Sequence, residues 1–509
     1  METEDQRNTI DFLSRPATHG ASGPVERIET HISIIFLVGA KAYKMKKALK
    51  LPYVDFSTAS IREEACRNEV ALNSETAPGL YIGMRRVTRA DDGALELDGE
   101  GLLVETVIEM MRFDQEQLFD RMAVAGRLTP DLMTATARMI ADYHAKAPVV
   151  STGGGADNIA AVLEINEAGF ATSHVFDPAA VARLGERLRI SLGRHAPLLD
   201  RRAFEGRVRR CHGDLHLRNI CLLDARPCLF DCIEFSAQIA TIDVLYDLAF
   251  LLMDLWHRGF ADLANLLANR YLDETGDDEG FCLLPFFMAI RAAVRAHVTA
   301  TQAEEPGQDV GRLSAEAKSY FELATALLEE KPPQLIAIGG LSGTGKTTVA
   351  DKLAPKLGAA PGARIVESDR IRKALFGVTA ETRLPPPAYD QGVSKRVYRA
   401  MARLAQSILS QGSSVVADAV FARPEDRALI EQCEEGAGFH GIWLDAAPAL
   451  LRRRVESRRG GSSDADLSVL TQQLQADAGA ISWHRIDASL STQEIIDTVV
   501  ETLSSSQRV

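Results

Sequence analysis

The sequence lacks an excess of positive charge. Its 57 lysines and arginines are outnumbered by 70 aspartates and glutamates, which gives a formal net charge of -13. Because a chain with this charge repels polyanions overall, we expect no general nucleic-acid binding. Small molecules are therefore the expected partners.

Long apolar runs and paired cysteines are also missing. No uninterrupted apolar run approaches the roughly 20 residues that span a bilayer, so we expect no membrane protein. The N-terminal residues METEDQRNTIDF are acidic and polar, unlike a secretion signal. The seven cysteines form no CxxC pair, and Cys228 and Cys232 lie in the apolar run PCLFDCIEF, where buried free thiols are common. These features predict a cytoplasmic protein.

The chain is long enough for more than one domain. It has 509 residues, with 46% hydrophobic and 25% charged residues, which is typical of globular proteins. The segment EEKPPQ interrupts a helical pattern with two prolines, and the strand-like run LIAIGG follows it. The sequence therefore predicts two domains, 1–330 and 331–509.

The two parts differ in their periodicity. The first begins with short apolar runs typical of strands, interrupted by a helical stretch, TASIREEACRNEVALNSE, with Ser57 or Ser60 as a possible N-cap. Residues 130–199 and 243–328 have the composition of helices. After residue 334, apolar runs alternate with helical ones, which predicts a parallel sheet covered by helices.

The strongest motif is GLSGTGKT, Gly340–Thr347, which fits GxxxxGK[ST] between a strand and a helix. Its glycines would let backbone amides converge on phosphates, Lys346 would reach the β and γ phosphates, and Thr347 would hold magnesium. The alternative is a glycine-rich turn without a ligand. The expected nucleotide-binding residues are Gly340, Ser342, Gly343, Thr344, Gly345, Lys346, Thr347 and Thr348.

Further charged residues follow the strands of this part. Asp369 ends a strand and Arg372 lies three residues on, so a helix beginning at Arg370 would put both on one side of its first turn. We interpret Asp369 as a general base and Arg372 as a substrate clamp; an N-cap aspartate beside a solvated arginine is the alternative. Asp418, at the end of SVVADAVF, is expected near magnesium or as a helix cap.

An arginine-rich segment completes the predicted site. Arg454 and Arg458 lie four residues apart in ALLRRRVESRRGGSS and would share one helix face. With Arg459 they would form a lid that clamps the nucleotide. A solvated helix is the alternative.

The segment from about residue 335 to 509 resembles the P-loop small-molecule kinases, which include gluconate kinase, chloramphenicol phosphotransferase and polynucleotide kinase. GLSGTGKT, SDRIR and VVADAVF carry this resemblance. In that family the aspartate of the SDxxR stretch acts on the acceptor hydroxyl, which implies the same role for Asp369.

A second constellation occupies Arg210–Ser236, RCHGDLHLRNICLLDARPCLFDCIEFS. Phosphoryl transfer needs a carboxylate that orients the attacking hydroxyl, together with oxygen ligands for magnesium. Asp214 would supply the first, and Asn219 and Asp231 would supply the second. We interpret His212 and His216 as structural.

HGDLHLRN, with the acidic strand after it, resembles the HGDxHxxN motif of the aminoglycoside phosphotransferase family, and the resemblance covers most of residues 25–330. It implies a protein-kinase-like fold of two lobes, with Lys44 on the phosphates and Glu69 as its helix partner; Lys46 is the neighbouring choice. The chain departs from the pattern where Cys232, rather than glycine, follows Asp231.

The predicted fold is thus an α+β protein-kinase-like two-lobed domain followed by an α/β P-loop domain with a parallel sheet. The leading hypothesis is a bifunctional phosphotransferase that moves the γ-phosphoryl group of ATP to hydroxyls of small molecules, with Mg2+ at both sites. A nucleotide-binding regulatory protein with one inactive kinase-like module is the second hypothesis, because a fold does not fix a function. Aminoglycoside resistance is the third.

Overall fold

The structure is a computed structural model that describes residues 4–51, 54–150, 154–304, 307–433, 436, 438–457 and 461–506. The chain forms two compact units. The first comprises Met1–Ile159 with Ala196–Asp254, and the second comprises Ala160–His195 with Leu255–Val509. The division into domains 1–330 and 331–509 stays a prediction.

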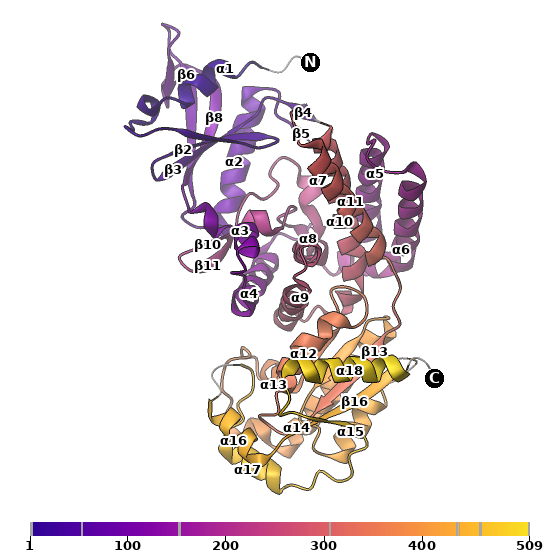
Figure 1. Ribbon diagram of the computed structural model, residues 1–509. Helices are drawn as coiled ribbons and strands as arrows, with labels where there is room; N and C mark the ends of the chain where they lie inside the picture. Colours follow the sequence, from indigo (N-terminus) through magenta and orange to yellow (C-terminus); the bar gives the residue numbers. More distant parts are fainter. Residues whose placement is uncertain are drawn as a thin grey trace. The chain divides into compact units, whose positions relative to one another are not determined.

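The first unit opens with an antiparallel sheet of six strands in the order β1-β2-β3-β8-β6-β7 (Figure 1). Its central strands are largely buried, and their β-branched and aromatic residues suit a packed pleated surface. Beside these residues they carry the buried lysines Lys44 and Lys46. The strands are β1 (Glu26–Glu29), β2 (Ser33–Val38), β3 (Lys41–Lys46), β6 (Tyr81–Arg89), β7 (Leu95–Leu97) and β8 (Leu102–Met111). Smaller elements nearby are α1 (Arg7–Leu13), η1 (Pro16–His19), β4 (Lys50–Leu51) and β5 (Val54–Asp55).

Helix α2 (Ala59–Thr76) packs against β6 and β8 (Figure 1). Its N-cap is Thr58, whose side chain accepts a hydrogen bond from Ile61 N. The expected caps Ser57 and Ser60 are therefore wrong. Ser60 already lies inside the helix, and the Ser57 hydroxyl donates to Asp55 instead.

Helices and two short antiparallel strand pairs, β9 with β12 and β10 with β11, complete the first unit. The HGD segment connects β9 to η3, and the acidic segment after it connects β11 to α7. The elements are η2 (Gln115–Gln117), α3 (Phe119–Val124), α4 (Pro130–Lys146), β9 (Val208–Arg210), η3 (Leu217–Asn219), β10 (Ile220–Leu223), β11 (Arg226–Leu229), α7 (Ala237–Ala240), β12 (Thr241–Asp243) and α8 (Val244–His257).

A helical region follows, in which α10 and α11 pack along each other. Its elements are α5 (Gly155–Ala171), α6 (Pro178–Phe204), α9 (Ala261–Thr275), η4 (Asp278–Leu283), α10 (Leu284–Ala303) and α11 (Val310–Leu327). Within the described residues, one helical stretch, Asp278–Ala303, is apolar and long enough to cross a bilayer, with a mean hydropathy of 1.5. Because 72% of its apolar 18-residue segment is buried inside the fold, it has the properties of a core helix.

The C-terminal part contains a five-stranded sheet in the order β14-β15-β13-β16-β17, and every neighbouring pair is parallel. This arrangement confirms the predicted α/β class for this part. Its strands are β13 (Gln334–Gly339), β14 (Arg364–Glu367), β15 (Val415–Asp418), β16 (Gly438–Asp445) and β17 (His484–Asp487). Its helices are α12 (Lys346–Leu353), η5 (Ala354–Lys356), α13 (Ser368–Leu375), η6 (Pro386–Tyr389), α14 (Gln391–Ser410), α15 (Pro424–Glu431), α16 (Pro448–Ser457), α17 (Leu467–Gln475) and α18 (Thr492–Ser506).

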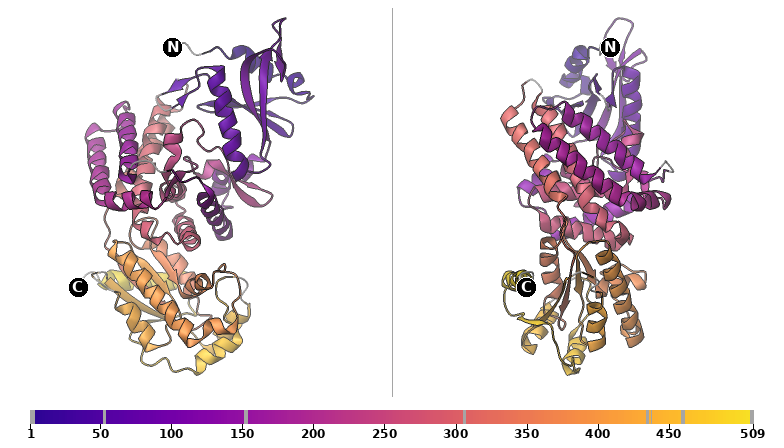
Figure 2. Two further views of the ribbon diagram at one scale, coloured as in Figure 1. Left: turned by 180° about the vertical axis from the view of Figure 1, so that it is seen from behind. Right: turned by 90° about the vertical axis from the view of Figure 1, so that its right-hand side faces the viewer.

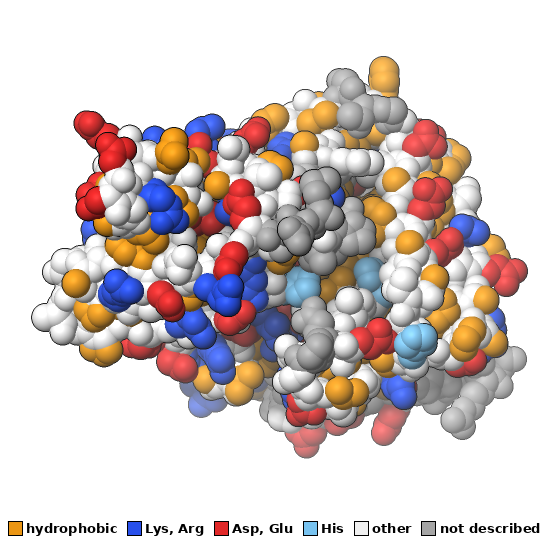
Figure 3. Space-filling model, turned by 90° about the horizontal axis from the view of Figure 1, so that it is seen from above, with side chains coloured by type: hydrophobic (Ala, Val, Ile, Leu, Met, Phe, Trp, Pro, Cys, Tyr) orange, Lys and Arg blue, Asp and Glu red, His pale blue; other side chains and the backbone are white. Residues whose placement is uncertain are grey.

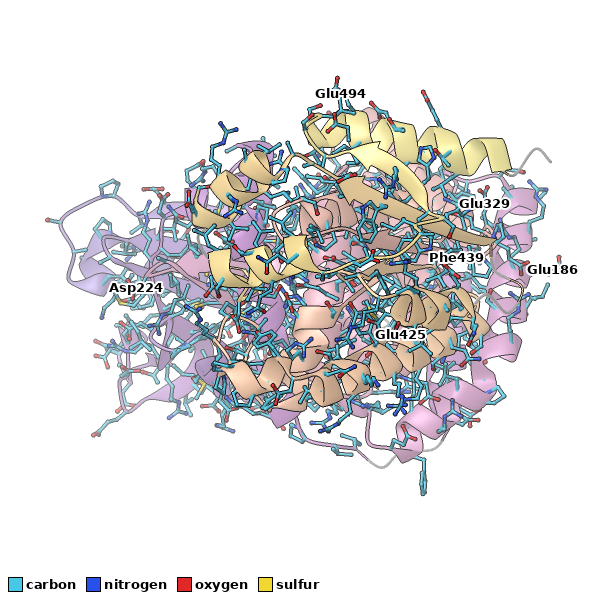
Figure 4. All side chains as sticks on the ribbon, turned by 90° about the horizontal axis from the view of Figure 1, so that it is seen from below. Glu186, Asp224, Glu329, Glu425, Phe439 and Glu494 are labelled. Carbon is cyan, nitrogen blue, oxygen red and sulfur yellow. The ribbon has the colours of Figure 1, made fainter. Side chains whose placement is uncertain are left out.

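Helices cover both faces of this parallel sheet. The rear view in Figure 2 shows α14 lying across one face. In Figure 4 the sheet is seen from below, with Glu494 on α18 to one side, Glu425 on α15 to the other, and Phe439 on β16 between them. Parallel strands buried on both faces require nearly continuous apolar runs, and β13 has one in LIAIG.

Helix α9 satisfies the backbone of β14, which lies at the edge of the sheet. Asn269 Oδ1 accepts a hydrogen bond of 2.7 Å from Ile365 N, and Asn265 Nδ2 donates to Ala363 O at 2.9 Å. An uncovered edge strand would expose unpaired amides and carbonyls to other chains. The two asparagines, one helical turn apart, therefore close this edge.

Candidate active sites

The loop between β13 and α12 has a backbone that requires glycine. Gly340, Gly343 and Gly345 have φ values of +138°, +90° and +92°. A Cβ at Gly340 would also lie 2.5 Å from the carbonyl oxygen of Leu444. The N-cap residue of α12 is Gly345, which has no side chain to bond the amides of the first turn. Amides at a helix N-terminus after a glycine loop form an anion site.

The other motif residues surround this loop. Lys346 Nζ donates to Leu341 O at 3.2 Å, and the hydroxyl of Thr344 donates to the same carbonyl at 2.9 Å. Ser342 is buried, and its amide donates to the Gln473 side chain at 2.9 Å. Thr348 is exposed in the first turn of α12. The structure thus brings the sequence motif together at one strand-to-helix junction.

Thr347, in the first turn of α12, is hydrogen-bonded to Asp418, the last residue of β15. The hydroxyl of Thr347 donates a hydrogen bond of 2.7 Å to Asp418 Oδ2. The pKa of Asp418 is raised to about 7, mainly because the carboxyl is buried. The charge of Glu367 also contributes to this increase, whereas the charge of Lys346 lowers the pKa. A hydroxyl and a carboxylate oxygen at the mouth of a phosphate loop fit the ligands that Mg2+ takes in such sites.

Glu367 is a third acidic side chain at this edge, and sequence reasoning missed it. It ends β14 directly opposite Asp418 in the register of β15, and it is buried. It accepts hydrogen bonds from Arg370 Nε at 2.9 Å and from the hydroxyl of Ser462. The sequence feature that could have identified Glu367 is a carboxylate at the last position of a buried strand.

Asp369 lies in the first turn of α13, which begins at Ser368 rather than at Arg370. Burial raises the pKa of Asp369, and the nearby charge of Glu367 raises it further. The charges of Arg372 and Lys346 and a hydrogen bond with Ser463 lower this pKa, but they do not outweigh the first two causes. A carboxyl whose pKa is raised in this way accepts a proton more readily than an ordinary aspartate. Its role as general base stays a prediction.

Arg372 is buried close to Asp369. Its Nη1 donates to Ala388 O at 2.8 Å, and its guanidinium lies 4.8 Å from the ring centroid of Tyr389. Its Nε is buried, and none of the described residues is a hydrogen-bond partner for it. A buried guanidinium with a free donor suits contact with an acceptor, but the clamp role stays a prediction.

The arginine-rich helix lies against the phosphate loop. Arg454 Nη1 lies 3.5 Å from the carbonyl oxygens of both Gly343 and Thr344. Arg458 and Arg459 lie outside the described residues. Of these arginines, Arg454 is therefore the one whose position the structure gives, and its role in a lid stays a prediction.

Asp464, which follows this lid segment, was also missed. It accepts hydrogen bonds from Lys373 Nζ at 2.7 Å, Leu384 N at 2.8 Å and Tyr389 OH at 2.5 Å. Burial opposes ionisation, but these donors outweigh it and lower the pKa of Asp464. The carboxylate thus joins the lid segment to the residues around Arg372.

The HGD segment, in the first unit, forms the other candidate site, which comes first along the chain and is called the first site; the phosphate loop forms the second site. Asn219 Nδ2 donates to Asp214 Oδ2 at 3.0 Å and to the Asp214 carbonyl at 2.9 Å. His216 Nε2 lies 3.3 Å from Asp214 Oδ2, and the Asp214 side chain is 40% exposed. Asp214 is therefore held by its neighbours but remains accessible to a substrate.

Buried groups form hydrogen bonds that hold the HGD segment in place. Asp247 accepts hydrogen bonds from His212 N at 3.1 Å and Gly213 N at 2.9 Å. The His212 ring contacts Phe230 O at 3.0 Å. Burial lowers the pKa of His212, although Asp247 and Asp214 oppose this. A buried histidine with backbone partners suits a structural role, and that role stays a prediction.

Lys44 and Glu69 pair as the resemblance implies. Lys44 Nζ donates to Glu69 Oε1 at 2.7 Å. The same ammonium also forms an ion pair with Asp231, a predicted magnesium ligand. Asp231 has a φ of +62°, which is rare for a residue other than glycine and costs of order 1–3 kcal/mol, a strain concentrated at functional sites. The structure thus brings Lys44, Glu69 and Asp231 together.

Glu234 and Lys46, which the sequence analysis named as the neighbouring choice to Lys44, extend this cluster. Lys46 Nζ donates to Glu69 Oε2 at 2.6 Å and forms an ion pair with Glu234. Burial opposes ionisation of Glu69, but Lys44 and Lys46 outweigh it and lower the pKa of Glu69 to about 2. Two lysines therefore share one glutamate.

Comparisons with known families bear on both sites. Residues 83–282 match the model of the phosphotransferase enzyme family, and residues 335–477 match a model described as an AAA domain. The first match contains the HGD segment, and the second contains the phosphate loop. The two resemblances seen in the sequence are confirmed.

Relatives and solved structures are similar to this chain over different shares of its length. "Uncharacterized protein Rv2004c" of Mycobacterium tuberculosis H37Rv is 29% identical over 478 residues, covering 91% of this chain and 92% of the relative. A choline/ethanolamine kinase family protein from Mesorhizobium loti is 15% identical with a TM-score of 0.41, covering 64% of this chain and 94% of that one. A gluconokinase from Sinorhizobium meliloti 1021 is 21% identical with a TM-score of 0.25, covering 34% and 97%.

Proposed function

Because the chain joins a phosphotransferase-family segment to a P-loop kinase segment, we propose that it is a bifunctional ATP-dependent phosphotransferase. Each site would transfer the γ-phosphoryl group of ATP to a hydroxyl of a small molecule. The observation that carries the proposal is the glycine loop with its first-turn amides beside the Thr347–Asp418 hydrogen bond of 2.7 Å. This arrangement has the donors for phosphate and the oxygens for magnesium.

ATP supplies the phosphoryl group at each site, and magnesium neutralises the charge that develops on it. At the second site the loop amides and Lys346 would hold the phosphates. Thr347 and Asp418 would hold the metal. Asp369 would accept the proton of the acceptor hydroxyl, and Arg372 would orient that acceptor.

At the first site Asp214 would orient the acceptor hydroxyl and accept its proton. Asn219 and Asp231 would supply oxygens to magnesium, and Lys44, steadied by Glu69, would bind the phosphates. The hydrogen bond of 3.0 Å from Asn219 to Asp214 supports this assignment, because it joins the proposed base to a proposed metal ligand.

Small molecules are the proposed acceptors, and nucleic acid is not. The net charge of -13 supports this, as does the mixture of acidic and basic side chains on the face seen in Figure 3. The proposed location is the cytoplasm, which the seven free cysteines of the chain support.

Kinetics of the purified full-length protein test the proposal. With Mg-ATP and a library of hydroxyl acceptors, Lys346→Ala should strongly reduce one activity and Asp214→Asn another. If neither substitution changes ATP turnover or nucleotide binding, the proposal fails.

One observation favours a second candidate, a nucleotide-binding regulatory protein with an inactive first module. The ion pair between Lys44 and Asp231 occupies two groups that catalysis would use separately. This candidate predicts that the first site binds Mg-ADP but shows no turnover that Asp214→Asn can remove.

A further inference from the structure

Two lysines point from the same face of β3 toward one buried glutamate. Lys44 and Lys46 are two residues apart, so their side chains leave the strand on the same side. Lys44 Nζ lies 2.7 Å from Glu69 Oε1, and Lys46 Nζ lies 2.6 Å from Glu69 Oε2. Each carboxylate oxygen of Glu69 thus has its own ammonium partner.

Lys46 is the more deeply buried lysine of the two. Its side chain is 1% exposed, against 11% for Lys44, and it lies 4.9 Å from the ring centroid of Phe56. Lys44 faces the accessible carboxylate of Asp231, whereas Lys46 faces Glu234, whose side chain is 4% exposed. Lys44 therefore has the position from which a ligand can be reached, and Lys46 does not.

The cluster also joins helix α2 to the segment that carries Asp231. Glu234 belongs to this segment and is bound by Lys46, which is bound in turn by Glu69 of α2. One turn further along α2, Asn73 Oδ1 accepts a hydrogen bond of 3.1 Å from Cys232 N. The segment is thus held at residues 232 and 234, both of which follow Asp231.

The charges of the cluster depend on each other. Two ammonium groups face the three carboxylates of Glu69, Asp231 and Glu234, which leaves a formal charge of -1. If Lys44 moves to phosphate oxygens and Asp231 to magnesium, Glu69 loses a partner. An unpaired buried carboxylate is costly, so a cluster with Lys44 alone would resist this change.

We propose that Lys46 is a positioning residue that holds Glu69 and Glu234 in place when Lys44 and Asp231 separate to bind a nucleotide and its metal. The inference rests on the proposed function of the first site. Lys46 acts through Glu69 and Glu234 and does not touch the nucleotide. The opposite assignment, in which Lys46 binds the phosphates itself, makes a different prediction for paired substitutions.

The test measures Mg-ADP binding by calorimetry in the full-length chain carrying Lys346→Ala, so that the phosphate loop contributes little. In that background we compare Lys46→Met with Lys46→Met/Glu234→Gln. The second variant restores the formal charge of the cluster to -1. The matched pair is Lys44→Met and Lys44→Met/Glu234→Gln, which change the charge by the same amounts. Lys50→Met, at a 51% exposed side chain, is the surface control.

Lys46→Met should weaken Mg-ADP binding about tenfold, and adding Glu234→Gln should restore the affinity to within about threefold, as expected for coupled neighbouring charges. Lys44→Met should weaken binding at least as much and should not be restored, because its ammonium is the group that binds phosphate. Lys50→Met should leave the affinity unchanged.

Two results would overturn the inference. One is restoration of neither lysine variant by Glu234→Gln, and the other is restoration of both to the same degree. If Lys46→Met does not fold, the double variant decides alone: an affinity within about threefold of the background sustains the inference, and a loss of about 100-fold overturns it. If the Lys346→Ala background binds no Mg-ADP at all, the proposed function of the first site falls as well, which separates that failure from the others.

Discussion

The hydroxyl of Thr347 donates a hydrogen bond of 2.7 Å to Asp418, joining the first turn of α12 to the end of β15. The two residues are 71 positions apart in the chain. Their contact unites the phosphate loop with the acidic group expected near magnesium, and it makes the second site the better defined of the two.

Replacing Lys346 by alanine should reduce kcat/KM of the second activity about 100-fold, because a preorganised cation on the transferring group is lost. Steady-state kinetics with Mg-ATP measures this effect. Lys352→Ala is the matched control, since Lys352 lies on the same helix with a side chain that is 53% exposed and pairs with Asp262. Equal losses in both variants would contradict the role of Lys346.

The stability of the magnesium-free protein should depend on Asp418. Burial raises its folded-state pKa from the ordinary aspartate value of 3.8 to about 7. Between about pH 4 and pH 7 the folded state therefore binds more protons than the unfolded state, so this group lowers the stability as the pH rises.

Asp418→Asn should remove that penalty and increase the free energy of unfolding at pH 8 by roughly 2–4 kcal/mol. The gain should vanish near pH 4. Urea unfolding in EDTA, followed by tryptophan fluorescence, measures it, because Trp443 and Trp483 belong to the C-terminal part. A gain of the same size at both pH values would refute a raised pKa.

Asp214→Asn should reduce turnover at the first site about 1000-fold while leaving Mg-ADP affinity within a small factor, because a general base acts on the acceptor and not on the nucleotide. The measurement uses the Lys346→Ala background. Asp224→Asn is the control: this residue, labelled in Figure 4, has a φ of +48° in the turn between β10 and β11, a conformation that asparagine tolerates. Nucleotide affinity lost together with turnover would argue against the base.

Arg454→Ala should lower kcat of the second activity about tenfold with a smaller change in KM, because a lid arginine acts mainly on the transition state. Arg453→Ala, an exposed neighbour on the same helix, should change neither constant. Indistinguishable effects of the two substitutions would support the alternative of a solvated helix.

Local patterns predicted much of this molecule. GLSGTGKT specified a strand-to-helix junction because its glycines are needed at positive φ, and the structure has them there at Gly340, Gly343 and Gly345. The alternating runs after residue 334 predicted a parallel sheet, because strands that are buried on both faces must be apolar. Local reasoning failed at the cap of α2, where Thr58 rather than Ser57 or Ser60 binds the first turn, because Asp55 takes the Ser57 hydroxyl.

The sequence by itself thus determined the fold class, the phosphate loop and the HGD segment, because each depends on residues that are neighbours in the chain. Only the tertiary structure decided which charges meet. It set Glu367 beside Asp418 through strand register, and Asn269 of α9 against Ile365 of β14. It also paired one carboxylate oxygen of Glu69 with Lys44 and the other with Lys46. Such pairings follow from how strands and helices pack in space, and no spacing along one segment records them.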